Sequence, residues 1–283
     1  MALRFNLYAV GVLAPGIGSL SELLACCRRA PEHAPTPTPT PATATAGLEL
    51  PPPKALPANE RRRASQVVRL TLACAEQALQ TSPFPVDSLR MVFASDEGTG
   101  EVCQQMLEAL ATTRMVSPLL FHNSVHNAPS GYFSIGYQNR QPATSVSLGH
   151  ESFASGLLCA ASEACTGGQP VLFLAYDAPM PEPMRSLLTV EHATATAWII
   201  ASGGEPASGQ AALASFELSL HSAATRTHQA LPAWLPAAWA ANSSAQGLVA
   251  LALLDATQEH AACELGVGAQ VLRIERVNTV AAC

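Results

Sequence analysis

His150 is the side chain whose place in the sequence is most suggestive of chemistry. It follows a short β-branched run at 143–148 that is typical of a buried strand, and Gly149, where the backbone can turn. A helical pattern over 153–164 and a continuous apolar run at 171–175 come next. A residue at such a strand, turn and helix junction is presented to a substrate, and an imidazole there could act as a general base or as a nucleophile.

The serines beside this turn raise a second possibility, which is hydrolysis. We expect Ser152 to cap the helix, and Ser155 follows one turn later. A nucleophile elbow requires G-x-S-x-G, whereas the chain from Gly149 has Gly-His-Glu-Ser-Phe-Ala and lacks the closing glycine. The pattern therefore argues against an α/β-hydrolase.

Two more histidines lie four residues apart in the segment 117–133, which we interpret as a loop. On a helix, His122 and His126 would share one face, as metal ligands often do. The glutamate of H-E-x-x-H is absent, and only His150 or Glu151 is an obvious third ligand. We expect neither a metal site nor a cofactor.

Composition and charge narrow the class of protein. The chain has 283 residues, 48% hydrophobic and only 13% charged, which favours a large core and a large buried interface. A net charge of −6 argues against nucleic acid or anionic membrane as a partner. The one basic run, Arg61–Arg63, is expected to open a helix that faces solvent or an acidic partner.

The eight cysteines form no C-x-x-C pair, and the N-terminus has no signal-peptide pattern. We therefore expect reduced thiols and a cytoplasmic protein, with Cys159 and Cys165 as buried structural thiols. No apolar run is long enough to span a bilayer.

Elements that could position these side chains alternate along the chain. A proline- and threonine-rich insertion at 31–58 should be extended and flexible. The turn at 95–100 has the acids Asp96 and Glu97 and no lysine, so it is a strand-to-helix turn and no phosphate loop. We expect strands at 5–12 and 89–94 and helices to 24, from 60 to 82 and at 101–110. The alternation predicts an α/β layered fold with a mainly parallel sheet.

In the C-terminal portion, 205–283, the residue pattern predicts a strand near 214–220, a helix-rich segment at 234–256 and a closing strand near 270–277. We interpret 1–283 as one domain.

A series of residues around the His150 turn resembles the nucleophile region of the β-ketoacyl synthases, which have a thiolase-like fold. The residues at matching separations are Asn127, Arg140, Pro142, Ala160, Ala161, Gly167 and Val171. The resemblance implies a thiolase-like layered α/β fold, mainly the N-terminal ketosynthase half with an abbreviated C-terminal portion. It puts His150 at the position of the catalytic cysteine.

The resemblance also implies what activity is missing. Condensation by a ketosynthase uses a cysteine thioester and two histidines from the second half of the enzyme. Neither the His-Gly-Thr-Gly-Thr motif nor the Lys-x-x-x-Gly-His motif follows Gly204, and the 79 residues from Glu205 are too few for a complete second half.

The chain is therefore similar to a chain length factor, in the short form found in bacterial aryl polyene clusters. Such a subunit is non-catalytic, forms a heterodimer with a Cys-bearing β-ketoacyl-ACP synthase and shapes its acyl tunnel; acyl carrier protein would be met through the complex. The alternative is an acyl-thioester enzyme, an acyltransferase or hydrolase, that uses His150 as base or nucleophile.

Site residues follow from the resemblance. The strand Thr144–Leu148 would pair with the partner's strand, and Tyr132 and Phe133 would form a wall of the tunnel. The complete set of expected tunnel and interface residues is His126, Asn127, Pro129, Tyr132, Phe133, Ser145, Ser147 and His150.

Overall fold

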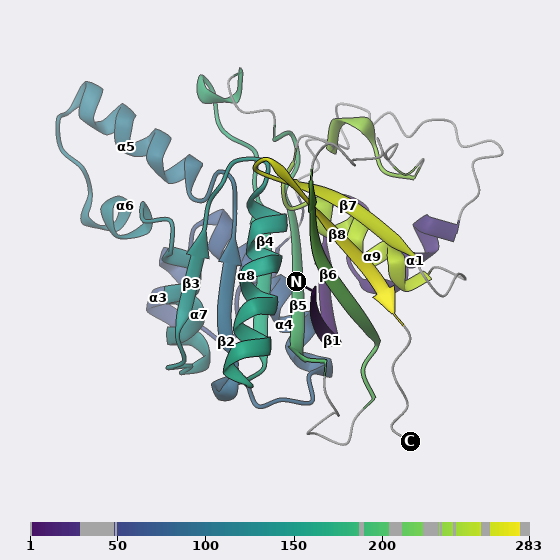
Figure 1. The fold of residues 1–283 in the computed structure, drawn as a ribbon. Helices are drawn as coiled ribbons and strands as arrows, with labels where there is room; N and C mark the ends of the chain where they lie inside the picture. Colours follow the sequence, from purple (N-terminus) through teal and green to yellow (C-terminus); the bar gives the residue numbers. More distant parts are fainter. Residues whose placement is uncertain are drawn as a thin grey trace.

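The computed structural model consists of one eight-stranded sheet with helices on both faces (Figure 1). The structure describes residues 2–28, 48, 50–186, 190–203, 211–222, 232, 234–239, 242–255 and 261–277. Most of the expected proline-rich insertion, 31–47, lies outside these residues. Its last part is packed rather than free, because Leu56 is buried in the same core as Val68 and Phe133.

The sheet is mixed, with strand order β3-β2-β4-β5-β1-β6-β8-β7. Only the pairs β2 with β3 and β2 with β4 are parallel, and the other five are antiparallel. The α/β layered fold is confirmed, but the expectation of a mainly parallel sheet is wrong. The strands β1, β5, β6, β7 and β8 have only antiparallel neighbours, and the short turn between β7 and β8 can join only antiparallel strands. The strands are β1 (Ala2–Leu13), β2 (Arg90–Ala94), β3 (Ala143–Val146), β4 (Val171–Asp177), β5 (Thr194–Ser202), β6 (Ala214–Ser222), β7 (Ala262–Val267) and β8 (Gln270–Val277).

The apolar run in β4 explains how the layers form. All seven of its residues are buried, and alternate side chains enter different cores: Phe173 packs with α8 and α9, whereas Leu172 packs with α4 and α7. The helices are α1 (Leu20–Arg28), α3 (Ala58–Arg63), α4 (Gln66–Thr81), α5 (Gly100–Thr112), α6 (Pro118–Asn123), α7 (Ala128–Tyr137), α8 (Ser152–Gly167) and α9 (Gln246–Ala252), with short 3-10 turns at Val86–Ser88, Met184–Ser186, Ala237–Trp239 and Leu253–Asp255.

Most of the segment 117–133 is helical, in α6 and the start of α7, so its interpretation as a loop is wrong. Ser117 caps α6 by accepting a hydrogen bond from the Leu120 amide at 3.2 Å, and Pro118 occupies the first turn. Asn127 precedes α7, and Pro129 lies in its first turn. The prolines therefore begin helices here instead of breaking them.

The helix α5 projects from the body of the molecule (Figure 1). Of its thirteen residues only Gly100 and Val102 are buried. A helix of this length has little stability alone, so we expect another protein surface to pack against α5. No helix among the described residues is long and apolar enough to cross a membrane.

Candidate functional site

The chain turns at Gly149, as expected. Its φ of 59° lies in the left-handed region, which glycine adopts without strain. Ser152 is not the cap, because Glu151 occupies that position and Ser152 lies in the first turn of α8. The buried Ser152 hydroxyl instead accepts from the Leu148 amide at 2.9 Å and donates to the Gly149 carbonyl at 2.6 Å. This hydroxyl ties the strand to the helix and is not displayed as a nucleophile.

Residues from the C-terminal portion hold the His150 turn. The Gln246 side-chain amide lies 3.0 Å from His150 Nε2 and donates to the His150 carbonyl at 3.0 Å. The Gly268 amide, in the turn between β7 and β8, donates to the Glu151 carboxylate at 2.6 Å. The His150 side chain stays exposed at this clamped turn. Sequence reasoning missed Gln246, since nothing in its local pattern points to a residue so far away along the chain.

A buried carboxylate lies at the carboxyl end of β4. Asp177 accepts hydrogen bonds from the Ser95 hydroxyl at 2.9 Å, the Asp96 amide at 2.8 Å and the Ser244 amide at 2.8 Å. Burial raises the pKa of Asp177 to about 6, and these hydrogen bonds oppose the rise. Asp177 therefore joins the turn after β2 to the segment that precedes α9.

Two further acids, Asp96 and Glu97, flank this hub. Burial, followed by the charges of Asp96 and Asp177, raises the pKa of Glu97 to about 7. Burial also raises the pKa of Asp96, while the nearby His150 lowers it. The turn 95–100 is a strand-to-helix turn, as expected, and its Asp96 lies near His150.

The histidines His122 and His126 belong to different surroundings. His126 packs on the turn after β2, with Nε2 3.3 Å from the Ser95 carbonyl. The His122 ring instead meets the Tyr132 ring edge-on, at a centroid distance of 6.0 Å. Within the described ranges, no group of three or more His, Cys, Asp and Glu side chains could hold a metal ion.

The helices α6 and α7 border a largely apolar groove with a volume of about 530 Å³. Two of the expected tunnel residues, Asn127 and Tyr132, line it. Phe133 does not, because it is fully buried between α7 and the sheet, with its ring 6.2 Å from Phe93 and 4.6 Å from Tyr137. Pro129 is also buried, in the first turn of α7. The complete lining of this α6–α7 groove is Pro118, Phe121, His122, Val125, Asn127, Ala128, Gly131, Tyr132 and Ile135.

The edge strand β3 contains Ser145, and Ser147 follows it. Among the described residues β3 pairs only with β2, so its other side presents unpaired backbone groups. No residue of β3 is charged, and Ser145 and Ser147 are exposed. The Ser147 hydroxyl donates to the Asp96 carbonyl at 3.2 Å.

The helices α5, α6 and α7 lie on the same side of the molecule as β3 (Figure 1). Of the large hydrophobic side chains that are exposed in the described residues, all but Leu213 and Leu220 come from α5, α6, α7 and the segments that join or follow them. We call this set the apolar face: Leu107, Leu110, Met115, Leu119, Phe121, Val125, Ile135 and Leu148. Its members come from the part of the chain between α5 and the end of β3.

The two thiols of α8 are only partly buried. Burial is the main cause that raises the pKa of both Cys159 and Cys165 above the ordinary value. Both are therefore protonated near neutral pH, which suits a structural role.

Comparison with known proteins assigns the fold and the family. The model of the β-ketoacyl synthase N-terminal domain matches residues 33–259. Searched against the curated proteins, the chain has no significant match.

Among solved structures, a ketosynthase (ApeO) in complex with its chain length factor (ApeC) from Xenorhabdus doucetiae is similar at 22% identity with a TM-score of 0.70, over 97% of this chain and 100% of that one. The ishigamide ketosynthase/chain length factor has a TM-score of 0.71 at 13% identity, over 97% and 99% of the two chains. The type II complex AntDE:AntF, an acyl-carrier protein with its ketosynthase bound to the hexaketide, has a TM-score of 0.75 at 12% identity, over 98% and 99%. These likenesses show a shared thiolase-like fold. With the family model covering most of its length, the chain belongs to the β-ketoacyl synthase N-terminal domain family.

Proposed function

We propose that this chain is a chain length factor, a non-catalytic ketosynthase-like subunit that forms a heterodimer with a Cys-bearing β-ketoacyl-ACP synthase in polyketide or aryl polyene biosynthesis. Histidine at the position of the nucleophilic cysteine supports the loss of condensation, because imidazole does not replace a thiolate in forming the acyl thioester. The shared fold with chains of ketosynthase and chain length factor complexes is consistent with this role.

The uncharged β3 edge beside the apolar face is the observation that carries the proposal. A bare edge strand without lysine or proline is a ready template for another strand. Five exposed large apolar side chains on α5, α6 and α7, and three more in the segments beside them, are typical of a surface that another protein covers. A partner that adds a strand to β3 and covers α5 to α7 would satisfy both features.

The α6–α7 groove is our candidate for the contribution to the acyl tunnel. Tyr132 and Asn127 line it, and Ile135 and Phe121 border it with exposed apolar surface. When the partner covers this groove, its floor would limit the length of the acyl chain that the synthase holds. Acyl carrier protein would deliver the chain through the complex, which we expect in the cytoplasm.

Expression of the chain alone and together with its cognate synthase tests the heterodimer. We expect soluble material only from co-expression, and a one-to-one complex by light scattering. A soluble, monodisperse homodimer that condenses acyl groups unaided would refute the proposal.

A second candidate, an acyl-thioester enzyme that uses His150, is favoured by one observation. Asp96 lies close enough to His150 for their charges to interact, and Glu97 has a pKa of about 7, which suits a general base. Against it, His150 Nε2 is already in contact with the Gln246 amide. The substitution His150→Ala separates the two: a structural subunit keeps the activity of its partner, whereas an enzyme loses thioester cleavage of its own.

A further inference from the structure

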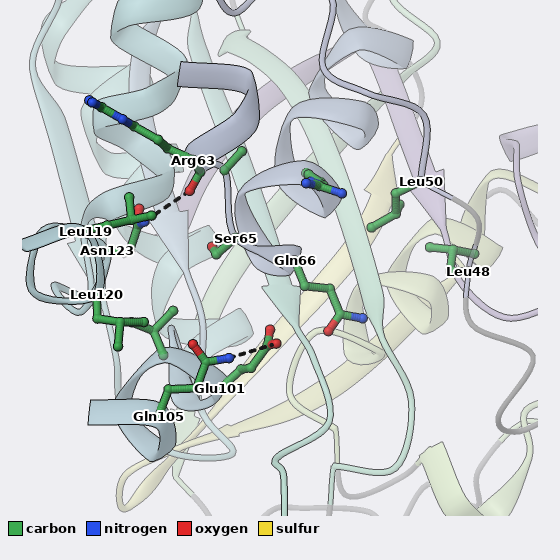
Figure 2. Close-up of a pocket in the computed structure, with 13 residues that line it drawn as sticks. Leu48, Leu50, Arg63, Ser65, Gln66, Glu101, Gln105, Leu119, Leu120 and Asn123 are labelled. Atoms are coloured by element: carbon green, nitrogen blue, oxygen red, sulfur yellow. Dashed lines mark hydrogen bonds between the residues drawn. The ribbon is translucent and has the colours of Figure 1, made fainter. Parts of the chain in front are cut away.

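Polar side chains link separate elements on the side of the molecule that contains β3. One link lies in a cavity of about 440 Å³ between α4, α5 and α6, where the Asn123 side chain donates to the Arg63 carbonyl at 3.1 Å (Figure 2). Asn123 is buried, so this link adds to the packing that already holds α6. A second link, between α8 and β3, holds a strand that has little packing of its own.

The strand β3 is weakly held by apolar contacts. It consists of four residues, none of which is buried, whereas all seven residues of β4 are buried. Val146 packs against the core from a half-buried position. In the part of the chain that the structure describes, β2 is the single neighbour of β3 in the sheet. A short edge strand of this kind opens readily unless other contacts fix it.

Glu163 of α8 supplies such a contact with both of its carboxylate oxygens. Its Oε1 accepts a hydrogen bond from the Thr144 hydroxyl at 2.9 Å. Its Oε2 accepts one from Nε of Arg90, the first residue of β2, also at 2.9 Å. Hydrogen bonds to an ionised carboxylate are stronger than neutral ones. We call Arg90, Thr144 and Glu163 the Glu163 tether, because they join α8 to both strands of the β2–β3 pair.

The tether acts on a residue whose backbone points to β2. The carbonyls of Pro142 and Val146 accept hydrogen bonds from amides of β2 and the turn after it, at 3.0 and 3.1 Å. Backbone groups along a strand point alternately to its two sides, so Ala143 and Ser145 direct their amide and carbonyl groups to the open edge. A fixed Thr144 therefore fixes the direction of these edge groups.

A contribution to global stability does not account for this cluster. The side chains of Arg90 and Glu163 are 27% and 18% exposed, and a partly exposed ion pair adds little to the free energy of unfolding. Its position beside an edge strand without buried residues suits a local role instead.

We propose that Glu163 is a positioning residue for the β3 edge, which it holds through Thr144 so that Ala143 and Ser145 present their backbone groups to a partner strand in one orientation. The inference rests on the proposed heterodimer for the identity of that partner, whereas the tether is a feature of this chain alone.

The substitution Thr144→Val tests the proposal, because it removes the hydroxyl and keeps the shape and strand preference of the side chain. We expect recovery of the complex with tagged synthase to fall at least about fivefold. Thr144→Ser keeps the hydroxyl and should stay within about twofold. Glu163→Ala should cause a loss similar to that of Thr144→Val, and the double variant should lose little more than either single one.

The matched control is Thr166→Val. The Thr166 hydroxyl donates to the Ser162 carbonyl of its own helix at 2.7 Å, so its removal leaves β3 untouched and should leave recovery unchanged. The urea midpoints of Thr144→Val and Thr166→Val should agree, since the loss at β3 is local.

Hydrogen exchange measures the tether itself, in the free chain or, where only the complex is soluble, in the complex. The carbonyls of β3 protect alternate amides of β2, so exchange in the peptide that covers 90–95 should be about fivefold faster in Thr144→Val. It should be unchanged in Thr144→Ser, and the peptide that covers 171–177 should keep its rate in both variants.

Unchanged exchange in Thr144→Val would overturn the proposal, and so would faster exchange with unchanged recovery of the complex. A fall in the urea midpoint large enough to explain the lost recovery would mean a role in global stability only, which also contradicts positioning. If the unsubstituted chain recovers no synthase, the proposed heterodimer fails, and the exchange rates then decide by themselves whether Glu163 positions β3.

Discussion

The two edges of the sheet, β3 and β7, differ in the features that prevent or permit pairing with another chain. The β7 edge contains Glu264, which lies 3.6 Å from Arg273 of β8, and its buried Cys263 and Leu265 pack on the core shared with α8 and α9. The β3 edge has no charge and is followed by Leu148, 58% of which is exposed. A charged, inward-packed edge resists strand addition, whereas a bare edge beside apolar helices accepts it.

From this difference we expect a partner at the β3 end of the sheet and none at the β7 end. The His150 turn, the acids near Asp177 and the apolar face all lie at the β3 end of the strand order. The C-terminal strands β6, β8 and β7 form the opposite end and also help to clamp the His150 turn through Gly268.

The largest effect is expected from a charge placed on the β3 edge. Ser145→Lys should lower recovery of the complex with tagged synthase at least about tenfold, because pairing would bury an unpartnered ammonium group. The matched change on the other edge, Ala262→Lys, should leave recovery unchanged. Equal loss from both variants would contradict the difference between the edges.

Two phenylalanines, one in α6 and one in α7, should separate core from interface. Phe133→Ala removes a fully buried ring and should lower the free energy of unfolding by about 3 to 5 kcal/mol. Phe121→Ala, at a ring with 68% exposure, should change it by less than about 0.5 kcal/mol while weakening recovery of the complex.

Urea pulse proteolysis, which follows each chain of a complex separately on a gel, measures both stabilities. If Phe121→Ala proved as destabilising as Phe133→Ala, the α6 surface would be part of the core and no interface.

The acids at the β3 end should make stability depend on pH. The folded-state pKa of Asp177, about 6, lies above its ordinary 3.8, so the folded protein binds this proton more tightly. Stability from Asp177 is therefore gained as pH falls through 6 and lost as pH rises, by about 1 kcal/mol between pH 5 and 7.

Glu97, with a pKa of about 7, should also make the protein less stable as pH rises. Its contribution should be smaller than that of Asp177, because its side chain is partly exposed and its charge is screened by solvent. Urea midpoints at pH 5, 6.5 and 8 should thus fall with rising pH, and less steeply in Glu97→Gln. A rise in stability from pH 5 to 8 that Glu97→Gln leaves unaltered would count against this electrostatic account.

The smallest effect is expected at the β7 edge. Glu264→Ala removes the half-buried partner of Arg273 and should cost about 0.5 kcal/mol or less, with unchanged recovery of the complex. A large loss of complex in this variant would show that β7 also meets the partner.

Much of the fold was predictable because it depends on local pattern. The apolar run at β4, the helix α4, the left-handed turn at Gly149 and the strands β6 and β8 are where the sequence predicts them. The strands β5 and β7 were missed, and so was the short helix α6, whose proline and histidine residues conceal a capped first turn.

The candidate site was predicted only in part. Among the expected residues, His150, Ser145 and Ser147 are exposed at the β3 end, and Tyr132 and Asn127 line a groove. Phe133 points into the core instead, because helix side chains follow a 3.6-residue period and the sequence does not show which face of α7 the sheet covers.

The sequence by itself determined the family and the order of most elements, and it predicts a histidine at the nucleophile position, since these depend on residue type and short spacing. Only the tertiary structure decided which groups meet: Gln246 reaches His150 from 96 residues away, and Ser95 reaches Asp177 from 82. Contacts across such separations depend on strand order and register, which no local pattern encodes. The same strand order left β3 uncovered and turned an ordinary strand into a candidate interface.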